Sequence, residues 1–282
     1  VKTAMKIIEC PRDAWQGFDS FIPTKDKISY INTLLQVGFD TIDFGSFVSA
    51  KAIPQVSDTA ILVKELDKSN TKTKLLSIVA NERGAAEACE FENIDWIGFP
   101  FSISETFQLR NTKSTIAQSL DRVASIAARC QAAQKELVIY ISMGFGNPYQ
   151  DPWSPDLVLS YIDQLAQFNI HTFALSDTVG VADVASIDFI FRNIIASRPT
   201  LEVGAHFHTL PNQWRAKIDA AYQAGCRRFD GAILGYGGCP MAQNDLVGNM
   251  PTEQLIAYAY ENDESDHYDM HAFEKARNAF LR

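Results

Sequence analysis

The sequence lacks the long apolar run that crosses a membrane, since none of its hydrophobic stretches reaches roughly 18 residues. It also lacks an N-terminal charged-then-apolar signal region and an Arg- and Ser-rich leader, so we expect a protein of the cytoplasm. Positive charge is scarce as well. The chain has 25 Lys and Arg against 34 Asp and Glu, and its net charge of −9 argues against nucleic acid or an anionic membrane as a partner.

Cysteine is scarce and irregularly spaced. No pair has the C-x-x-C spacing and the number is odd, so we expect free thiols in a reducing compartment. A Gly-x-Gly-x-x-Gly run is missing after the first predicted strand, which argues against a dinucleotide-binding fold. What the chain does have is a hydrophobic fraction of 46%, enough for a sizeable core. The five cysteines are Cys10, Cys89, Cys130, Cys226 and Cys239.

Short apolar runs alternate with helical patterns along the whole chain, in eight strand–helix units of roughly 30 residues. The predicted strands are Met5–Glu9, Thr41–Phe44, Leu75–Val79, Trp96–Phe101, Leu137–Ile141, His171–Leu175, Glu202–Phe207 and Arg228–Leu234. An additional helix is predicted at His271–Leu281. Eight unbroken βα units favour an α/β fold, a (β/α)₈ TIM barrel that forms one domain over residues 1–282, rather than an open doubly wound sheet.

Two of only five histidines, His206 and His208, lie two positions apart at the end of an apolar run. In a strand both side chains share a face, with Cα atoms roughly 6.6 Å apart, so they can bind one metal ion; a hydrogen-bonded core pair is the alternative. Barrel closure makes strands seven, eight and one neighbours and brings Asp13 and Asn249 to the same mouth. Together the four residues predict a mixed oxygen and nitrogen site for Mg²⁺ or Mn²⁺.

Arg12 and Cys239 add candidate catalytic groups at this mouth. Arg12 could stabilise a developing enolate oxygen as a charged donor, or be a surface charge. Cys239 follows two glycines that permit close backbone approach, and it is an acid/base candidate or a buried structural thiol. Other polar residues at strand ends would line the same rim, although each alone also fits a cap or a turn: Asp43, Ser46, Asn81, Tyr140, Ser142, Asp177 and Thr178. Apart from Asp43, these residues are expected to bind substrate together with Arg12.

In combination these motifs resemble the 3-hydroxy-3-methylglutaryl-CoA lyases, within the metal-dependent lyase/synthase superfamily of TIM barrels. The resemblance covers most of the chain, and the Gly-Gly-Cys-Pro run points to the lyase branch. The matching stretches are Pro11-Arg12-Asp13, Gly45-Ser46-Phe47-Val48-Ser49 with Pro54-Gln55, Ser176-Asp177-Thr178-Val179-Gly180, Ala205-His206-Phe207-His208, and Gly237-Gly238-Cys239-Pro240 with Gly248-Asn249.

The resemblance implies that Asp13, His206, His208 and Asn249 bind a divalent cation, to which the 3-hydroxyl and carbonyl of an acyl-CoA substrate coordinate. A base, either His206 or solvent on the metal, would remove the hydroxyl proton. The C2–C3 bond would then break in a retro-Claisen step that yields acetyl-CoA and acetoacetate. Arg12 would stabilise the enolate and Cys239 would protonate it, with Asp43 near the catalytic centre.

Several positions depart from the family pattern. Asp43 stands where the lyases carry glutamate, Ala174 replaces a serine and Val138 an arginine, and Thr209 stands where an aspartate follows the second histidine. The segment from Cys239 to Asn249 is one residue longer. These changes concern the acyl group, so a lyase for a related 3-hydroxyacyl-CoA, a synthase or aldolase of the same superfamily, and a non-catalytic metal-bound barrel stay alternatives. Candidates for the CoA phosphates are Lys51, Arg110 and Lys113; a homodimer is one candidate assembly.

Overall fold

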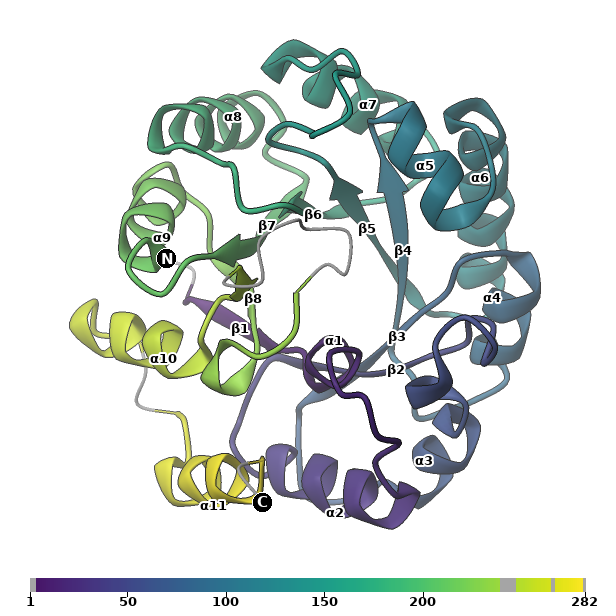
Figure 1. The fold of residues 1–282 in the computed structure, drawn as a ribbon, viewed down its shortest axis with the longest axis vertical. Coiled ribbons are helices and arrows are strands. Elements are labelled where there is room, and N and C mark those ends of the chain that lie inside the picture. The colour runs from purple at the N-terminus through teal and green to yellow at the C-terminus, as the bar shows by residue number, and fades with distance from the viewer. Residues whose placement is uncertain (1–3, 239–246, 265–266, 281–282) are drawn as a thin grey trace.

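The computed structural model describes residues 4–238, 247–264 and 267–280. Its eight parallel strands pair in chain order, and β1 pairs with β8 to close the barrel. Figure 1 shows the closed ring of strands with the helices outside it, so the predicted TIM barrel is confirmed. The strands are β1 (Lys6–Glu9), β2 (Thr41–Ser46), β3 (Lys74–Ile78), β4 (Trp96–Ser102), β5 (Glu136–Ser142), β6 (Thr172–Asp177), β7 (Glu202–Thr209) and β8 (Arg228–Gly231).

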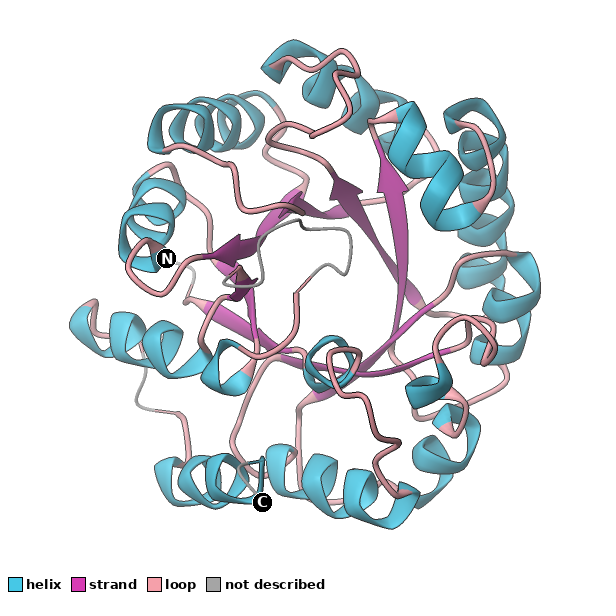
Figure 2. Cartoon of the chain, viewed as in Figure 1, coloured by secondary structure: helices cyan, strands magenta, loops and turns pink. Residues whose placement is uncertain are grey.

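Helices cover the outer face of the barrel, and the additional C-terminal helix is present as α11 (Figure 2). None of the described helices is long and apolar enough to cross a membrane. The helices are α1 (Pro11–Trp15), α2 (Thr24–Leu34), α3 (Thr59–Glu65), α4 (Glu82–Cys89), α5 (Glu105–Thr112), α6 (Ile116–Ala132), α7 (Pro155–Ala166), α8 (Val184–Ser197), α9 (Trp214–Gln223), α10 (Thr252–Glu261) and α11 (Met270–Phe280), with 3₁₀ turns η1 (Pro54–Val56) and η2 (Ile233–Gly235).

The strands are apolar on both faces because helices cover one face and the barrel interior the other. Every residue of β2 and of β6 is buried. Gly98 lets the interior close, since a Cβ there would lie 3.0 Å from the Tyr140 ring and 2.5 Å from Ile78. A small inner cluster fills the barrel below its mouth: Leu76, Ile78, Trp96, Val138, Tyr140 and Ala174.

Three local elements differ from the sequence-based prediction. Pro11 begins the short helix α1, which is not among the predicted elements, because proline fits the first helical position. Helix α5 lies in a stretch for which no element was predicted, and Ser104 is its N-cap. Strand β8 ends at Gly231 instead of Leu234, because the chain enters the turn η2, where Leu234 has φ 62°.

A two-residue strand, β9 (Gly248–Asn249), pairs antiparallel with the end of β7. The register places Asn249 opposite His208 and Gly248 opposite Thr209. The loop that follows β8 therefore returns to the strand that carries both histidines. This pairing sets the position of Asn249 at the barrel mouth.

Candidate active site

Asp13, His206 and His208 form a compact group of possible metal ligands at the C-terminal end of the barrel. Each offers one ligand atom, and these atoms all lie within 4.8 Å of one another. Asn249 Nδ2 donates to Asp13 Oδ2 at 2.7 Å and to the carbonyl oxygen of Tyr236 at 2.8 Å. Because its N–H groups are engaged in this way, Oδ1 is the side-chain atom that could bind a cation. The structure thus brings together all four residues predicted as metal ligands.

The two histidines have different electrostatic surroundings. Burial lowers the pKa of His206, but a hydrogen bond and the negative charge of Asp230 raise it above its usual value. His206 Nδ1 lies 3.0 Å from Asp230 Oδ2, which leaves Nε2 to face a ligand. For His208, burial together with His206 outweighs the opposing effects of Asp13 and of a backbone hydrogen bond with Gly248, and lowers its pKa to about 4. His208 is therefore neutral at physiological pH, the form that binds metals.

Arg12 is held by two carboxylates at the same end of the barrel. Its Nη2 lies 2.5 Å from Asp43 Oδ2, its Nε donates to both Asp43 oxygens at 3.2 Å, and its Nη1 lies 3.1 Å from Asp13 Oδ1. Burial lowers the pKa of Arg12, and Asp43 and Asp13 together raise it, so the guanidinium stays charged. Burial raises the pKa of Asp43, against the lowering effect of Arg12. Asp43 thus faces Arg12 and orients it.

A cavity of about 670 Å³ opens above this group. Apolar side chains such as Val48, Ile53 and Phe107 form part of its wall. The size fits the acyl part of a thioester better than a single metal ion. Most of the predicted site residues line the same cavity: Arg12, Asp13, His206, His208, Ser46, Asn81, Tyr140, Ser142 and Thr178, together with Lys51 and Lys113.

Some rim residues also have a structural partner. Ser46 Oγ donates to the carbonyl of Ile78 at 2.9 Å. Asn81 caps α4 by accepting from the Gly84 N–H at 2.9 Å. Thr178 Oγ1 accepts from the Met143 N–H at 2.8 Å. These residues fix the strand ends and line the cavity at the same time.

Four predicted residues within the described part of the chain are not part of the cavity wall: Asp43, Asn249, Asp177 and Arg110. The Asp177 carboxylate lies 2.6 Å from Lys217 Nζ of α9 and accepts from the Val181 N–H at 2.8 Å, so it braces the loop after β6. Arg110 lies with its guanidinium 4.7 Å from the centre of the Tyr149 ring. The predicted catalytic residue Cys239 lies outside the described residues.

Sequence reasoning missed Asp230, which orients His206. The signal available was its position on β8, two residues after Arg228 and hence on the same inward face. Without the three-dimensional pairing of β7 and β8, that acid could equally be a core ion-pair partner. The structure resolves this ambiguity because Asp230 Oδ2 directly contacts the His206 ring.

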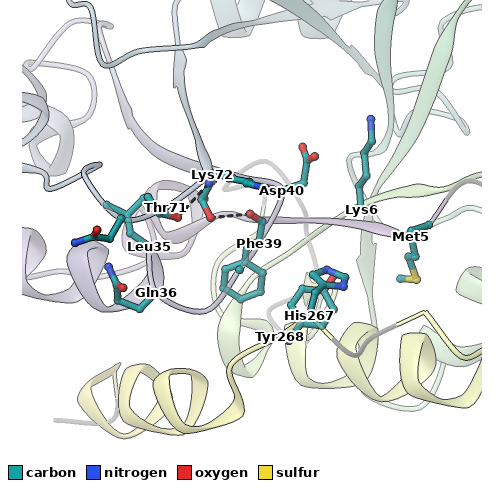
Figure 3. Close-up of a pocket in the computed structure, with 14 residues that line it drawn as sticks. Met5, Lys6, Leu35, Gln36, Phe39, Asp40, Thr71, Lys72, His267 and Tyr268 are labelled. Atoms are coloured by element: carbon teal, nitrogen blue, oxygen red, sulfur yellow. Dashed lines mark hydrogen bonds between the residues drawn. The ribbon is translucent and has the colours of Figure 1, made fainter.

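A second cavity, of about 560 Å³, lies at the opposite end of the barrel, around the N-terminal ends of β1 to β3 (Figure 3). Asp40 and His267 line it, but among the described residues they are not part of a group with metal-ligand geometry. Active sites of TIM barrels lie at the C-terminal ends of the strands. The mouth that holds His206 and His208 is therefore the candidate active site.

Taken together, the fold and the site define a (β/α)₈-barrel enzyme with a candidate divalent-metal centre beside a cavity of acyl size. The family model described as HMGL-like matches residues 5–279. The chain belongs to the HMGL-like family, which confirms the resemblance inferred from the motifs.

Curated relatives agree with this assignment. The chain is 32% identical over 246 residues to hydroxymethylglutaryl-CoA lyase YngG of Bacillus subtilis (strain 168), covering 87% of this chain and 81% of the relative. It is 28% identical over 262 residues to the 3-hydroxy-3-isohexenylglutaryl-CoA/hydroxy-methylglutaryl-CoA lyase of Pseudomonas aeruginosa, covering 93% and 86%. Both relatives are named as lyases of branched 3-hydroxyglutaryl-CoA thioesters.

Solved structures show the same likeness. An HMG-CoA lyase from Acinetobacter baumannii, in complex with coenzyme A and 3-methylmalate, is 29% identical and superposes with a TM-score of 0.90, over 98% of this chain and 90% of that one. The HMG-CoA lyase of Bacillus subtilis is 29% identical, with a TM-score of 0.91 over 98% and 92%. The barrel and its helices are thus shared almost end to end.

Proposed function

We propose that this enzyme is a divalent-metal-dependent carbon–carbon lyase that cleaves 3-hydroxy-3-methylglutaryl-CoA to acetyl-CoA and acetoacetate. The observation that carries the proposal is the set of Asp13, His206 and His208 ligand atoms within 4.8 Å of one another, beside Arg12 and under a cavity of acyl size. The names of the relatives, and the coenzyme A in one related structure, support the same substrate class.

The donor set fits a divalent cation. One carboxylate, two imidazoles and one amide oxygen, from Asp13, His206, His208 and Asn249, suit Mg²⁺ or Mn²⁺ and leave one side open toward the cavity. Such a cation polarises the substrate oxygens that it binds and stabilises the negative charge that develops on them. The four residues are proposed to hold it.

The groups around the donor set can each take a part in a retro-Claisen cleavage. Removal of the 3-hydroxyl proton lets a carbonyl form at C3 while the C2–C3 electron pair moves to C2. Solvent is the proposed base, because His206 has Nδ1 on Asp230 and is proposed to hold the cation through Nε2. The resulting enolate of acetyl-CoA carries its charge on the thioester oxygen, and Arg12 is the proposed donor to that oxygen. Asp43 acts as a positioning residue because it holds the Arg12 guanidinium. By resemblance, Cys239 protonates C2.

The rim of the cavity is the proposed binding surface for the rest of the substrate. Ser46, Asn81, Tyr140, Ser142 and Thr178 contribute hydroxyl and amide groups to it. Asp177 is better placed to brace the adjacent Thr178 than to bind substrate, because it pairs with Lys217. For the CoA phosphates, the lysines that line this cavity, Lys51 and Lys113, fit better than Arg110. The cytoplasmic location and the homodimer stay predictions.

A related 3-hydroxyacyl-CoA is the second candidate substrate. The Pseudomonas aeruginosa relative is named for an isohexenyl thioester as well as the methyl one. Of the departures from the family pattern, Asp43 contacts Arg12, whereas Val138 and Ala174 belong to the inner cluster below the mouth and do not line the cavity. A synthase or aldolase reaction would instead release CoA when the enzyme is incubated with Mg²⁺, acetyl-CoA and a 2-keto acid.

The test is an assay of acetyl-CoA release from several 3-hydroxyacyl-CoA thioesters, with and without EDTA. We expect release from the 3-hydroxy-3-methylglutaryl thioester that is abolished by EDTA and restored by excess Mg²⁺ or Mn²⁺. Full activity in EDTA would contradict the proposed dependence of the reaction on a divalent metal. A protein that binds Mn²⁺ and cleaves no thioester would instead support the non-catalytic barrel.

A further inference from the structure

The loop after β8 contains a run, Gly235-Tyr236-Gly237-Gly238, in which only one residue has a side chain. Its three glycines have φ of 67°, 86° and 128°, the region that residues with a Cβ rarely adopt. Glycine backbone has the greatest conformational freedom in the chain and therefore the least intrinsic order. Tyr236 is the one residue that can anchor the run through a side chain.

The backbone of this run lies directly against the candidate metal centre. The Tyr236 carbonyl accepts from Asn249 Nδ2 at 2.8 Å, which is one of the two contacts that orient the amide. A Cβ on Gly237 would lie 2.7 Å from the Asp13 carbonyl oxygen and 2.8 Å from Asn249 Nδ2. The contact is so close that a shift of the run also shifts the Asn249 amide.

The Tyr236 ring is held by an aromatic cluster on the surface. It stacks on Phe18, which follows α1, with ring centres 5.9 Å apart, and lies 5.1 Å from Phe280 at the end of α11. Phe18 and Phe280 are themselves 5.7 Å apart in an edge-to-face arrangement, and Phe280 also contacts Tyr30 of α2. Figure 1 shows α11 beside α2, outside the ring of strands.

We propose that Tyr236 is a positioning residue for Asn249, and that Phe18 and Phe280 hold Tyr236 in place. Helix α11, remote in sequence from the histidines, thereby contributes to metal affinity. The chain of contacts runs from the Phe280 ring to the Tyr236 ring, and from the Tyr236 carbonyl to the Asn249 amide. The inference rests on the proposed function because it takes Asn249 as a metal ligand.

The first experiment measures Mn²⁺ affinity of the full chain by calorimetric titration. Tyr236→Ala should weaken Mn²⁺ binding by about 10-fold or more, the usual effect of losing a group that orients a ligand. Tyr236→Phe keeps the ring and should retain the wild-type affinity. Phe280→Ala should weaken binding in the same direction. Phe189→Ala on α8 removes an aromatic ring with the same 47% exposure as Tyr236, and should leave the affinity unchanged.

A double-mutant cycle separates positioning from a general loss of stability. In the Asn249→Ala background, Tyr236→Ala should cause no further loss of Mn²⁺ affinity, because the residue through which it acts is gone. Titrations are run well below the unfolding midpoint of each variant. Unchanged Mn²⁺ affinity in Tyr236→Ala would overturn the inference. So would a loss of affinity on adding Tyr236→Ala to the Asn249→Ala protein that equals its effect in the wild type. If Tyr236→Ala does not fold, Phe280→Ala decides in the same way. A wild-type protein that binds no Mn²⁺ would overturn the proposed function instead.

Discussion

At the scale of single residues, the two histidines of β7 show how one neighbour changes the chemistry of a side chain. Both are at the mouth of the barrel, and their ring centres are 5.3 Å apart. The pKa of His206 is raised, chiefly by Asp230 against the effect of burial, whereas burial and His206 lower the pKa of His208 to about 4. The carboxylate of Asp230 on β8 therefore accounts for much of the difference in pKa between the two imidazoles.

His208→Ala should abolish stoichiometric Mn²⁺ binding, because it removes one of two imidazole ligands from a set of four. Elemental analysis after gel filtration in Mn²⁺ measures the change. His171→Ala is the matched control, since His171 is exposed at the start of β6, remote from the mouth. A His208→Ala protein that retains one Mn²⁺ per chain would contradict this ligand set.

Cys239→Ala should fold and bind Mn²⁺ as the wild type does, but lower kcat by about 10²-fold or more, the usual contribution of a general acid. The expectation comes from the resemblance, because this cysteine lies outside the described residues. Cys89→Ala changes a half-buried thiol at the end of α4 and should leave kcat unchanged. Full activity of Cys239→Ala would show that another group protonates the enolate.

The candidate site could be predicted residue by residue wherever backbone topology alone positions a side chain. Asp13, His206 and His208 follow from barrel closure, since the histidines are at the C-terminal end of β7 and Asp13 is in α1, which begins two residues after β1 ends. Asp177 occupies an equivalent place, but its carboxylate turns to Lys217 of a helix 40 residues later. The sequence contains no signal for that ion pair, because a side-chain rotamer depends on tertiary contacts that periodicity does not encode.

At the scale of elements, Glu9 ties β1 to the turn and helix that follow β8. Its carboxylate accepts from the Ile233 N–H at 3.0 Å and from Thr252 Oγ1 at 2.5 Å, at full burial. Burial raises the pKa of Glu9 to about 8. At pH values between its unfolded pKa of 4.5 and this value, Glu9 is protonated in the folded state and ionised in the unfolded state. The contribution of Glu9 to the free energy of unfolding is therefore present at low pH and falls as pH rises through this window.

Glu9→Gln should therefore flatten the pH dependence of unfolding. The wild type is expected to lose about 1.4 kcal/mol per pH unit from this group within the window. Glutamine keeps the acceptor oxygen for the Ile233 N–H and does not titrate. Urea unfolding at several pH values from 5 to about 8 measures the slope. Glu65→Gln, on an exposed position of α3, should keep the wild-type slope; equal slopes in both variants would contradict the assignment.

The order and type of the strands and of most helices could be predicted, because buried strands and amphipathic helices have distinct apolar patterns. Helix α5 could not, since its stability derives from the Ser104 cap and from packing rather than from a marked apolar stripe. The end of β8 was also beyond prediction. The run from Arg228 to Leu234 is mostly apolar, yet the chain leaves the strand after Gly231 and enters the turn η2 at Ile233.

At the scale of the whole molecule, the two ends of the barrel have separate roles. The proposed metal ligands, Arg12 and the cavity beside them are at the C-terminal end, whereas ion pairs such as Lys74 with Asp40 lie at the N-terminal end. Because the donors come from α1, β7 and β9, a bound cation links the first and last parts of the chain. Metal binding is therefore expected to stabilise the fold as a unit.

Saturating Mn²⁺ should raise the unfolding midpoint by several degrees. A ligand at 100 times its Kd stabilises the folded state by about 2.7 kcal/mol if it does not bind the unfolded chain. Differential scanning calorimetry with Mn²⁺, and again after EDTA, measures the shift. The His208→Ala protein is the control and should show none. An equal shift in that variant would mean that Mn²⁺ acts elsewhere on the surface.

The pairing of β9 with β7 has a consequence for how this enzyme can diversify. Because Asn249 is in register with His208, its place depends on a backbone ladder and not on the length of the chain that leads to it. The additional residue between Cys239 and Asn249 can therefore be accommodated without loss of a ligand. Segments of other lengths that retain Cys239, grafted between residues 239 and 247, should change substrate preference while the proposed cation site is kept.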